Sequence, residues 1–196
     1  MVQRKLEATV ATEGRLISEG PACRMAVLNP QPRPESSISA KSESLNNLSV
    51  VTELVCREQR VLFTGDIERE ALTRLNHSGN SAHIALLKVP HHGAKSSLER
   101  RWLETIRPAV GVVSAGRRNP YGHPAGEVLA AYQAVETQVW RTDRDGAIWA
   151  DLDLTRQELS MHSTREWILQ PALPSADIWS VEQDNLRRLW RRWNWT

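Results

Sequence analysis

Apolar residues in this chain gather into short runs that end at glycine, proline or clustered polar residues. Residues 85–89 form one such run, and Pro90 closes it because proline has no backbone N–H to continue a strand ladder. Residues 61–63 form a second run and residues 109–115 a third. Helical spacing of apolar residues marks three further ranges: 67–76, 98–106 and 126–134. Strands that alternate with helices in this way predict an α/β fold.

The flanking sequence predicts more strands. Residues 6–29 contain short β-type runs separated by turns, as in a meander, and residues 50–56 and 60–64 predict a hairpin. Residues 31–44 are rich in proline and serine and predict a loop. Residues 137–141 and 147–154 predict strands of another hairpin around the turn at 143–146, followed by a closing strand at 157–163. The aspartates at this turn do not follow a calcium-loop pattern, so turn and surface roles are expected for them.

Residues that bind metals follow each of the three apolar runs. Asp66 comes after the run at 61–63, His91 and His92 come directly after the run that Pro90 closes, and His123 lies in the polar loop after the run at 109–115. In layered α/β folds, ligand sites collect where strands end. A carboxylate and imidazoles at one such edge suit zinc, manganese or iron. The alternatives are that Asp66 caps the next helix and that His91 is an ordinary loop residue.

Two further segments carry candidate phosphate contacts. Lys95 and Ser96 precede the helix at 98–106, where a serine N-cap and free backbone N–H groups favour a phosphate. The alternative is that Ser96 or Ser97 only caps the helix. Arg117 and Asn119 lie in the loop with His123 and suit a sugar-phosphate backbone, although such a loop is equally typical of a solvated connection. His77 and His83 are expected to be surface or helix-end residues.

The composition of the chain limits its possible functions and location less strongly than the motifs do. The formal net charge of +2 is too small to indicate nucleic-acid binding over the whole surface, and 40% apolar residues suffice for a core. Cys23 and Cys56 lack metal-site spacing and do not predict a disulfide framework, so both are expected to be buried thiols. No apolar run reaches the roughly 20 residues that span a bilayer, and no signal peptide is evident, so this chain alone is expected in the cytoplasm.

Five motifs in order resemble one family. The segments NNLSVVTEL, VLFTGDIE, ALLKVPHHGAKSS, GVVSAGRRNPYGHP and WRTDRDGAI resemble the C-terminal metallo-β-lactamase-like domain of the ComEC family of DNA-internalisation competence proteins, over residues 27–154. The resemblance implies a metal-dependent nuclease fold, an αββα sandwich, joined to a membrane channel at the extracytoplasmic face. It implies manganese or zinc in a two-metal site, DNA as the substrate, and a place near the active site for Asn46 and Ser49. These two could also form a plain polar turn.

The chain departs from the family in one major respect. The HxHxDH motif, which supplies most metal ligands in such enzymes, does not occur, and no histidine precedes His77. Residues 1–163 are therefore interpreted as the second half of the domain, from a truncated gene, a misplaced start or a split protein. The family's HHGS is also HHGA here, with Ala94 in place of serine.

Two functions follow from the resemblance. In the first, Asp66 bridges two ions, His91 ligates one, and His123 ligates or acts as an acid, while Lys95, Arg117 and Asn119 hold the phosphate. In the second, the chain is an inactive remnant that binds DNA or a membrane partner. Residues 164–196 form a separate tail with five of the eight tryptophans. Its arginine- and tryptophan-rich amphipathic helix is expected to bind a membrane or nucleic acid, or to cover exposed core.

Overall fold

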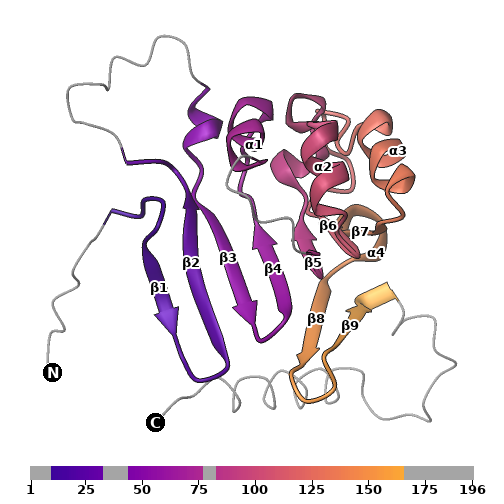
Figure 1. Cartoon of the computed structure of the whole chain (residues 1–196). Coiled ribbons are helices and arrows are strands. Elements are labelled where there is room, and N and C mark those ends of the chain that lie inside the picture. Colours follow the sequence, from indigo (N-terminus) through magenta and orange to yellow (C-terminus); the bar gives the residue numbers. More distant parts are fainter. Residues whose placement is uncertain (1–9, 33–43, 77–82, 166–196) are drawn as a thin grey trace, which may run out of the picture.

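The computed structural model describes residues 10–32, 44–76 and 83–165, and these form a mixed α/β fold (Figure 1). Its main sheet has seven strands in sequential order from β1 to β7. The first four pair antiparallel, namely β1 (Leu16–Glu19), β2 (Cys23–Asn29), β3 (Val51–Cys56) and β4 (Gln59–Phe63). The next three continue from β4 in parallel, namely β5 (Leu86–Lys88), β6 (Val110–Val113) and β7 (Gln138–Arg141). The predicted meander, the β3–β4 hairpin and the α/β class are confirmed.

A helix follows each of the parallel strands β4, β5 and β6. These helices are α1 (Arg69–Asn76), α2 (Arg100–Ile106) and α3 (Gly126–Ala134). They pack side by side and share one core with the sheet, so all three cover the same face (Figure 1). Three consecutive strand–helix–strand units with strands in sequential order produce this arrangement, because each crossover has the same hand. The three helices predicted from apolar spacing are confirmed.

Alternation along the strands divides the core between the two faces of the sheet. Leu62 and Leu87 point to the helices and belong to the large cluster with the buried apolar residues of α1, α2 and α3. Their neighbours Val61 and Leu86 point to the opposite face, where they meet a smaller cluster that includes Met161. Because side chains alternate along a strand, each buried parallel strand needs apolar residues in a continuous run. This explains why these runs in the sequence are mostly apolar.

The predicted hairpin between residues 137–141 and 147–154 is wrong. A short helix, α4 (Thr142–Asp145), lies between them, and β8 (Ile148–Asp153) pairs with β9 (Glu158–Ser163) in a separate two-stranded sheet. The turn becomes helical because the Asp145 carboxylate accepts from the backbone N–H of Arg141 at 2.9 Å. The Thr142 hydroxyl also accepts from the N–H of Ala115 at 2.8 Å, which anchors the chain to the main sheet. From there the chain crosses to the sheet face opposite the helices.

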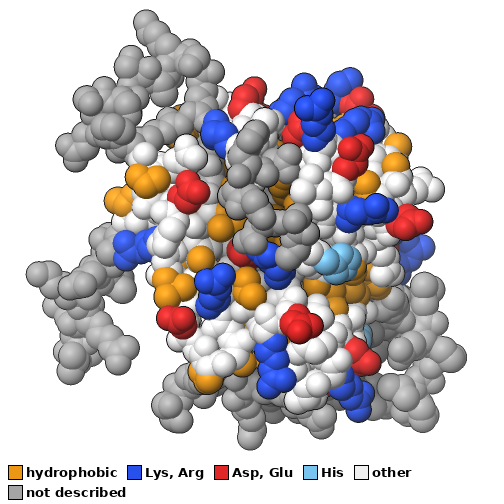
Figure 2. Space-filling view, in the orientation of Figure 1, with side chains coloured by type: hydrophobic (Ala, Val, Ile, Leu, Met, Phe, Trp, Pro, Cys, Tyr) orange, Lys and Arg blue, Asp and Glu red, His pale blue; other side chains and the backbone are white. Residues whose placement is uncertain are grey.

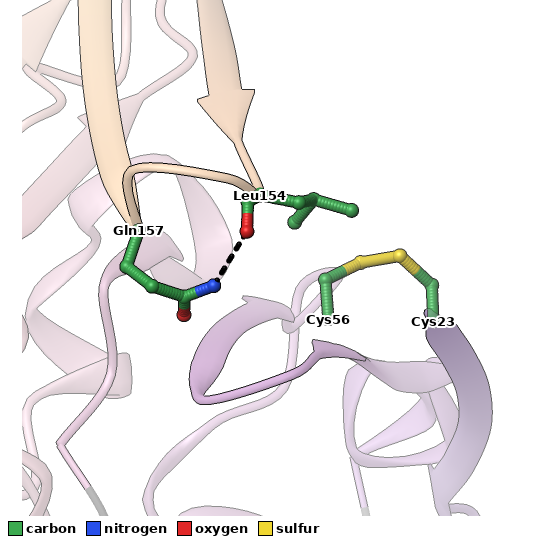
Figure 3. The surroundings of a disulfide bond; sticks show 4 residues. All are labelled: Cys23, Cys56, Leu154 and Gln157. Carbon is green, nitrogen blue, oxygen red and sulfur yellow. Dashed lines mark hydrogen bonds between the residues drawn. A yellow bond between two sulfur atoms is a disulfide. The ribbon is translucent and has the colours of Figure 1, made fainter. Parts of the chain in front are cut away.

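Cys23 and Cys56 form a disulfide, so the prediction of two buried thiols is wrong. The two residues lie directly opposite each other on the antiparallel strands β2 and β3, with Cα atoms 4.1 Å apart. That pairing depends on strand register, which cysteine spacing along the chain does not reveal. The disulfide lies beside the β8–β9 turn, where Gln157 donates to the Leu154 carbonyl at 2.8 Å (Figure 3).

Several predictions fall outside the described residues. These are the loop over residues 33–43, the helix end and His77 within residues 77–82, and the amphipathic helix of the tail. His83 is exposed, as predicted for a surface residue. No helix within residues 10–32, 44–76 and 83–165 has the length and apolar character that crossing a membrane requires.

Candidate functional site

The predicted site residues lie beyond the carboxyl ends of adjacent parallel strands. Asp66 follows β4, His91 and His92 follow β5, and His123 lies in the long loop after β6. Parallel strands end at the same edge of a sheet, and such edges are where α/β folds bind ligands. The structure therefore brings together the residues that the sequence placed after three separate apolar runs.

The turn after β5 has an unusual backbone. His91 and His92 have positive φ angles of 45° and 56° within the 3₁₀ turn Pro90–Gly93. Left-handed backbone is uncommon for residues with a side chain, and it is concentrated at functional sites where the surroundings impose it. Gly93 ends the turn at φ 78°, and a Cβ there would lie 2.6 Å from the Pro124 side chain. This close contact holds the loop that carries His123 against the histidine turn.

Asp66 is held by a cluster of backbone and side-chain contacts. Its N–H donates to the Ser49 hydroxyl at 3.1 Å, and Gly65 packs so closely on Ser49 that a Cβ on the glycine would lie 2.7 Å from the serine Cβ. Lys88 Nζ lies 3.4 Å from Asp66 Oδ1 and donates to the Gly65 carbonyl at 2.6 Å. Burial lowers the pKa of Lys88, and Asp66 acts in the opposite direction. Ser49 therefore lies beside Asp66.

His92 is a second neighbour of Asp66. Its Nδ1 lies 2.6 Å from the carbonyl oxygen of Ser114, and its Nε2 lies 3.6 Å from Asp66 Oδ1. Because a carbonyl can only accept, Nδ1 carries a hydrogen, and Nε2 is the nitrogen that faces the carboxylate. A metal-binding histidine typically has its other nitrogen fixed by a carbonyl in this way.

Glu68 organises the other side of the site. Its Oε1 accepts from Ser96 Oγ at 3.0 Å and from Asn46 Nδ2 at 3.3 Å, and it lies 3.2 Å from His91 Nδ1. Burial raises the pKa of Glu68, but hydrogen bonds from Asn46, Ser96 and Ser44 and the charge of His91 outweigh it, so the pKa is lowered overall. Glu68 is thus a carboxylate that orients His91, and the two predicted substrate contacts Asn46 and Ser96 belong to its network.

His123 faces His91 across the site, with ring centroids 6.0 Å apart, and it stacks on Tyr121. The Asn119 side chain shapes this loop. It donates to the carbonyl of His123 at 2.7 Å and accepts from the His123 N–H at 2.9 Å. Burial, together with the charges of His91 and His92, lowers the pKa of His123, so its imidazole is neutral at neutral pH. A neutral imidazole is the form that binds metals.

The donors fit part of a metal site. Two ligands of one zinc ion, each about 2.1 Å from the metal, lie about 3.4 Å apart in tetrahedral geometry. The 3.6 Å separation of Asp66 Oδ1 and His92 Nε2 is close to this value. Within the described residues, however, no three His, Cys, Asp or Glu side chains converge as a metal-binding group. The roles of Asp66, His91 and His123 as metal ligands therefore stay predictions.

Two other predicted phosphate contacts, Lys95 and Arg117, lie on the surface. Lys95 is exposed and pairs with Glu127 of α3 at 3.1 Å, and Arg117 is exposed in the loop after β6. The predicted serine N-cap is wrong, because α2 begins at Arg100 and Glu99 accepts from the N–H of Arg101 at 2.9 Å. Ser97 is buried, and its hydroxyl instead donates to carbonyl oxygens of Pro90 and Ala94.

Sequence reasoning missed Glu68 and Lys88 and did not assign His92 a role. Glu68 follows Asp66 within the FTGDIE segment, and its acidic side chain beside a predicted ligand was an available signal. His92 and His91 are adjacent and equivalent in sequence. Only the left-handed turn shows that His91 reaches Glu68 and that His92 reaches Asp66.

Comparison with known proteins identifies three relatives. The chain is 33% identical to ComE operon protein 3 of Bacillus subtilis over 105 residues, which are 54% of this chain and 14% of that protein. It is 30% identical to Recombination protein 2 of Haemophilus influenzae over 105 residues, 54% of this chain and 13% of that protein. It is 29% identical to the uncharacterized protein YcaI of Escherichia coli over 133 residues, 67% of this chain and 17% of that protein.

These relatives agree with the resemblance seen in the motifs. The chain is related to the ComEC-type competence proteins, and it matches 13 to 17% of the length of the relatives named above. No protein-family model matches it.

Proposed function

We propose that this chain is the C-terminal part of a competence protein and acts on DNA during uptake at the strand edge that carries Asp66, His91 and His123. The observation that carries the proposal is the meeting of these three residues, with His92 and Glu68, beyond three adjacent parallel strands. The relation to ComE operon protein 3 and Recombination protein 2 supports DNA as the substrate.

The proposed activity is metal-dependent hydrolysis of a phosphodiester. Asp66 and His92, with His123 and His91 nearby, would hold manganese or zinc, which in such sites supplies a Lewis acid and lowers the pKa of bound water. The chain's own groups have separate tasks. Glu68 fixes the His91 ring, Asn119 fixes the loop that presents His123, and Lys88 balances the charge of Asp66. In the proposed fold, the main sheet with its helices forms one half of an αββα sandwich and β8–β9 belongs to the other sheet.

The proposed location is the extracytoplasmic face of a bacterial membrane, joined to a membrane channel. The Cys23–Cys56 disulfide supports it, because structural disulfides persist in oxidising compartments and are rare in the cytosol of most bacteria.

The second candidate is a DNA- or membrane-binding module without catalysis. One observation favours it: the described residues do not complete a set of three metal ligands. In that case the nuclease site would need donors from outside this chain, or would not function.

A cleavage assay separates the two candidates. The full chain is incubated with labelled single-stranded DNA and manganese, beside Asp66→Ala and Asp151→Ala; Asp151 is an exposed aspartate on β8. An enzyme predicts cleavage that is lost in Asp66→Ala and kept in Asp151→Ala. Equal cleavage by all three proteins indicates a contaminating nuclease. No cleavage by the purified chain favours the binding module.

A further inference from the structure

A second charged feature lies on the helical side of the molecule. A cavity of about 650 Å³ opens between α1, α2 and α3, and its lining includes Arg69 of α1, Arg100 and Arg101 of α2, and Lys95. Figure 2 shows Lys and Arg side chains gathered at the top of the molecule, where Figure 1 places these helices. None of the three arginines belongs to the strand-edge site.

The charges around this cavity do not cancel. Its lining holds four cationic side chains and two acidic ones, Glu99 and Glu127. Both acids have local structural partners, since Glu99 caps α2 by accepting from the Arg101 N–H and Glu127 pairs with Lys95. Arg69 Nε donates to the Leu98 carbonyl at 3.2 Å, which orients its guanidinium beside the cavity. Guanidinium groups match the geometry of phosphate oxygens, so the lining suits an anion with several phosphates.

The cavity is continuous in sequence with the strand-edge site. Lys95 lines the cavity, while its neighbour Ser96 donates to Glu68 in the network around His91. One 3₁₀ turn, Lys95–Ser97, therefore connects the two features. A polynucleotide backbone is long enough to extend from the cavity past this turn to the strand-edge site, and it carries negative charge at regular intervals.

We propose that the cavity between α1, α2 and α3 binds the sugar-phosphate backbone of a DNA strand on the side of the Lys95–Ser97 turn away from Asp66. This inference rests on the proposed function for the identity of the ligand as DNA. Arg69, Arg100 and Arg101 contact successive phosphates and contribute affinity without reading base sequence. This cavity, called the groove below, positions the DNA strand. The site at the ends of β4, β5 and β6 acts on that DNA strand.

The test measures binding without catalysis. Fluorescence anisotropy follows a labelled single strand of DNA binding to the full chain in EDTA, between about 50 and about 200 mM NaCl. The plot of log affinity against log salt has a slope of about −0.7 per phosphate contact for single strands. The triple variant Arg69→Gln, Arg100→Gln, Arg101→Gln is expected to reduce the magnitude of the slope by about 2.

Control variants distinguish the charge of the groove lining from the net charge of the chain, and thermal melts detect loss of the fold. Arg156 is exposed in the β8–β9 turn, on the other sheet, so Arg156→Gln is expected to leave the slope unchanged. The triple Arg→Lys variant keeps the charges and is expected to retain most of the slope. All variants carry the same tail, so its contribution cancels in the comparison, and thermal melts confirm that each is folded.

Two results would overturn the proposal. The first is a triple Gln variant with the same slope as the unchanged chain. The second is a loss of binding to vesicles of anionic lipid in that variant with no change in DNA binding, which would assign the groove to a membrane surface. A chain that binds DNA through the groove but does not cleave it would contradict only the nuclease activity.

Discussion

Removal of the Cys23–Cys56 disulfide should destabilise the fold by an amount that the structure allows us to calculate. The bond joins residues 33 positions apart on β2 and β3. A crosslink restricts the unfolded chain, and the loss of loop entropy rises with the logarithm of the number of residues in the loop. For a loop of this length the relation gives about 3.7 kcal/mol at room temperature. This is a large fraction of the stability of an ordinary domain.

Urea unfolding measures this difference. With a typical urea slope of about 2 kcal/mol/M, reduction of the disulfide should lower the midpoint by about 2 M. The double variant Cys23→Ala, Cys56→Ala should unfold near the midpoint of the reduced chain, and a reducing agent should not affect it. Mass spectrometry of the alkylated, non-reduced chain should find no modified cysteine. Equal midpoints with and without reductant would refute the calculation, and alkylation of both thiols would refute the disulfide itself.

Three further predictions concern packing and protonation. Gly93→Ala should destabilise the fold by about 2 to 4 kcal/mol, because its Cβ would meet Pro124 at 2.6 Å in a left-handed backbone. Gly14 also has a left-handed backbone but open space around it, so Gly14→Ala should cost only about 1 kcal/mol. Equal losses of stability in urea unfolding of the two variants would contradict the packing argument. Leu87→Ala, fully buried, should cost about 2 to 5 kcal/mol by the same measurement, and a loss below 1 kcal/mol would contradict its place in the core. An NMR titration should give the His123 imidazole a pKa below its ordinary 6.5. The contribution of His123 to the stability of the fold is therefore full above pH 6.5 and is lost as the pH falls through the lowered pKa. A titration midpoint at or above 6.5 would contradict this prediction.

Apolar patterning was sufficient to predict the parallel half of the sheet. Strands β4, β5 and β6 are buried between two apolar layers, so their sequences contain mostly apolar runs bounded by Gly65, Pro90 and the loop at Gly116. Helix α3 also occupies the predicted range. These features follow from local sequence and from the rule that each buried face needs apolar residues.

Features that depend on contacts distant in sequence were not predictable. The Cys23–Cys56 bond needs the register of β2 on β3, and α4 needs the bond from the Arg141 N–H to Asp145 and the Thr142 contact with Ala115. The periodicity of apolar residues gives no information on the strand register or on the contacts that form α4. The hairpin was predicted because Asp143–Gly146 has typical turn composition, and composition does not distinguish a hairpin turn from a single helical turn.

The candidate site was predictable in position but not in detail. Strand ends placed Asp66, His91 and His123 at one edge, since parallel strands share a carboxyl end. The positive φ angles of the histidine turn decide which imidazole meets which carboxylate, and no sequence rule gives such angles to histidine in advance.

The claim that this strand edge contacts DNA is tested most directly by NMR of the histidine side chains. Single-stranded DNA is titrated into isotopically labelled chain without added metal, and the ring resonances are followed. We predict that the resonances of His91 and His123 shift together, while those of His162, on β9 in the separate sheet, stay in place. Shifts confined to His162, or no shift of His91 and His123 at saturating DNA, would contradict the claim.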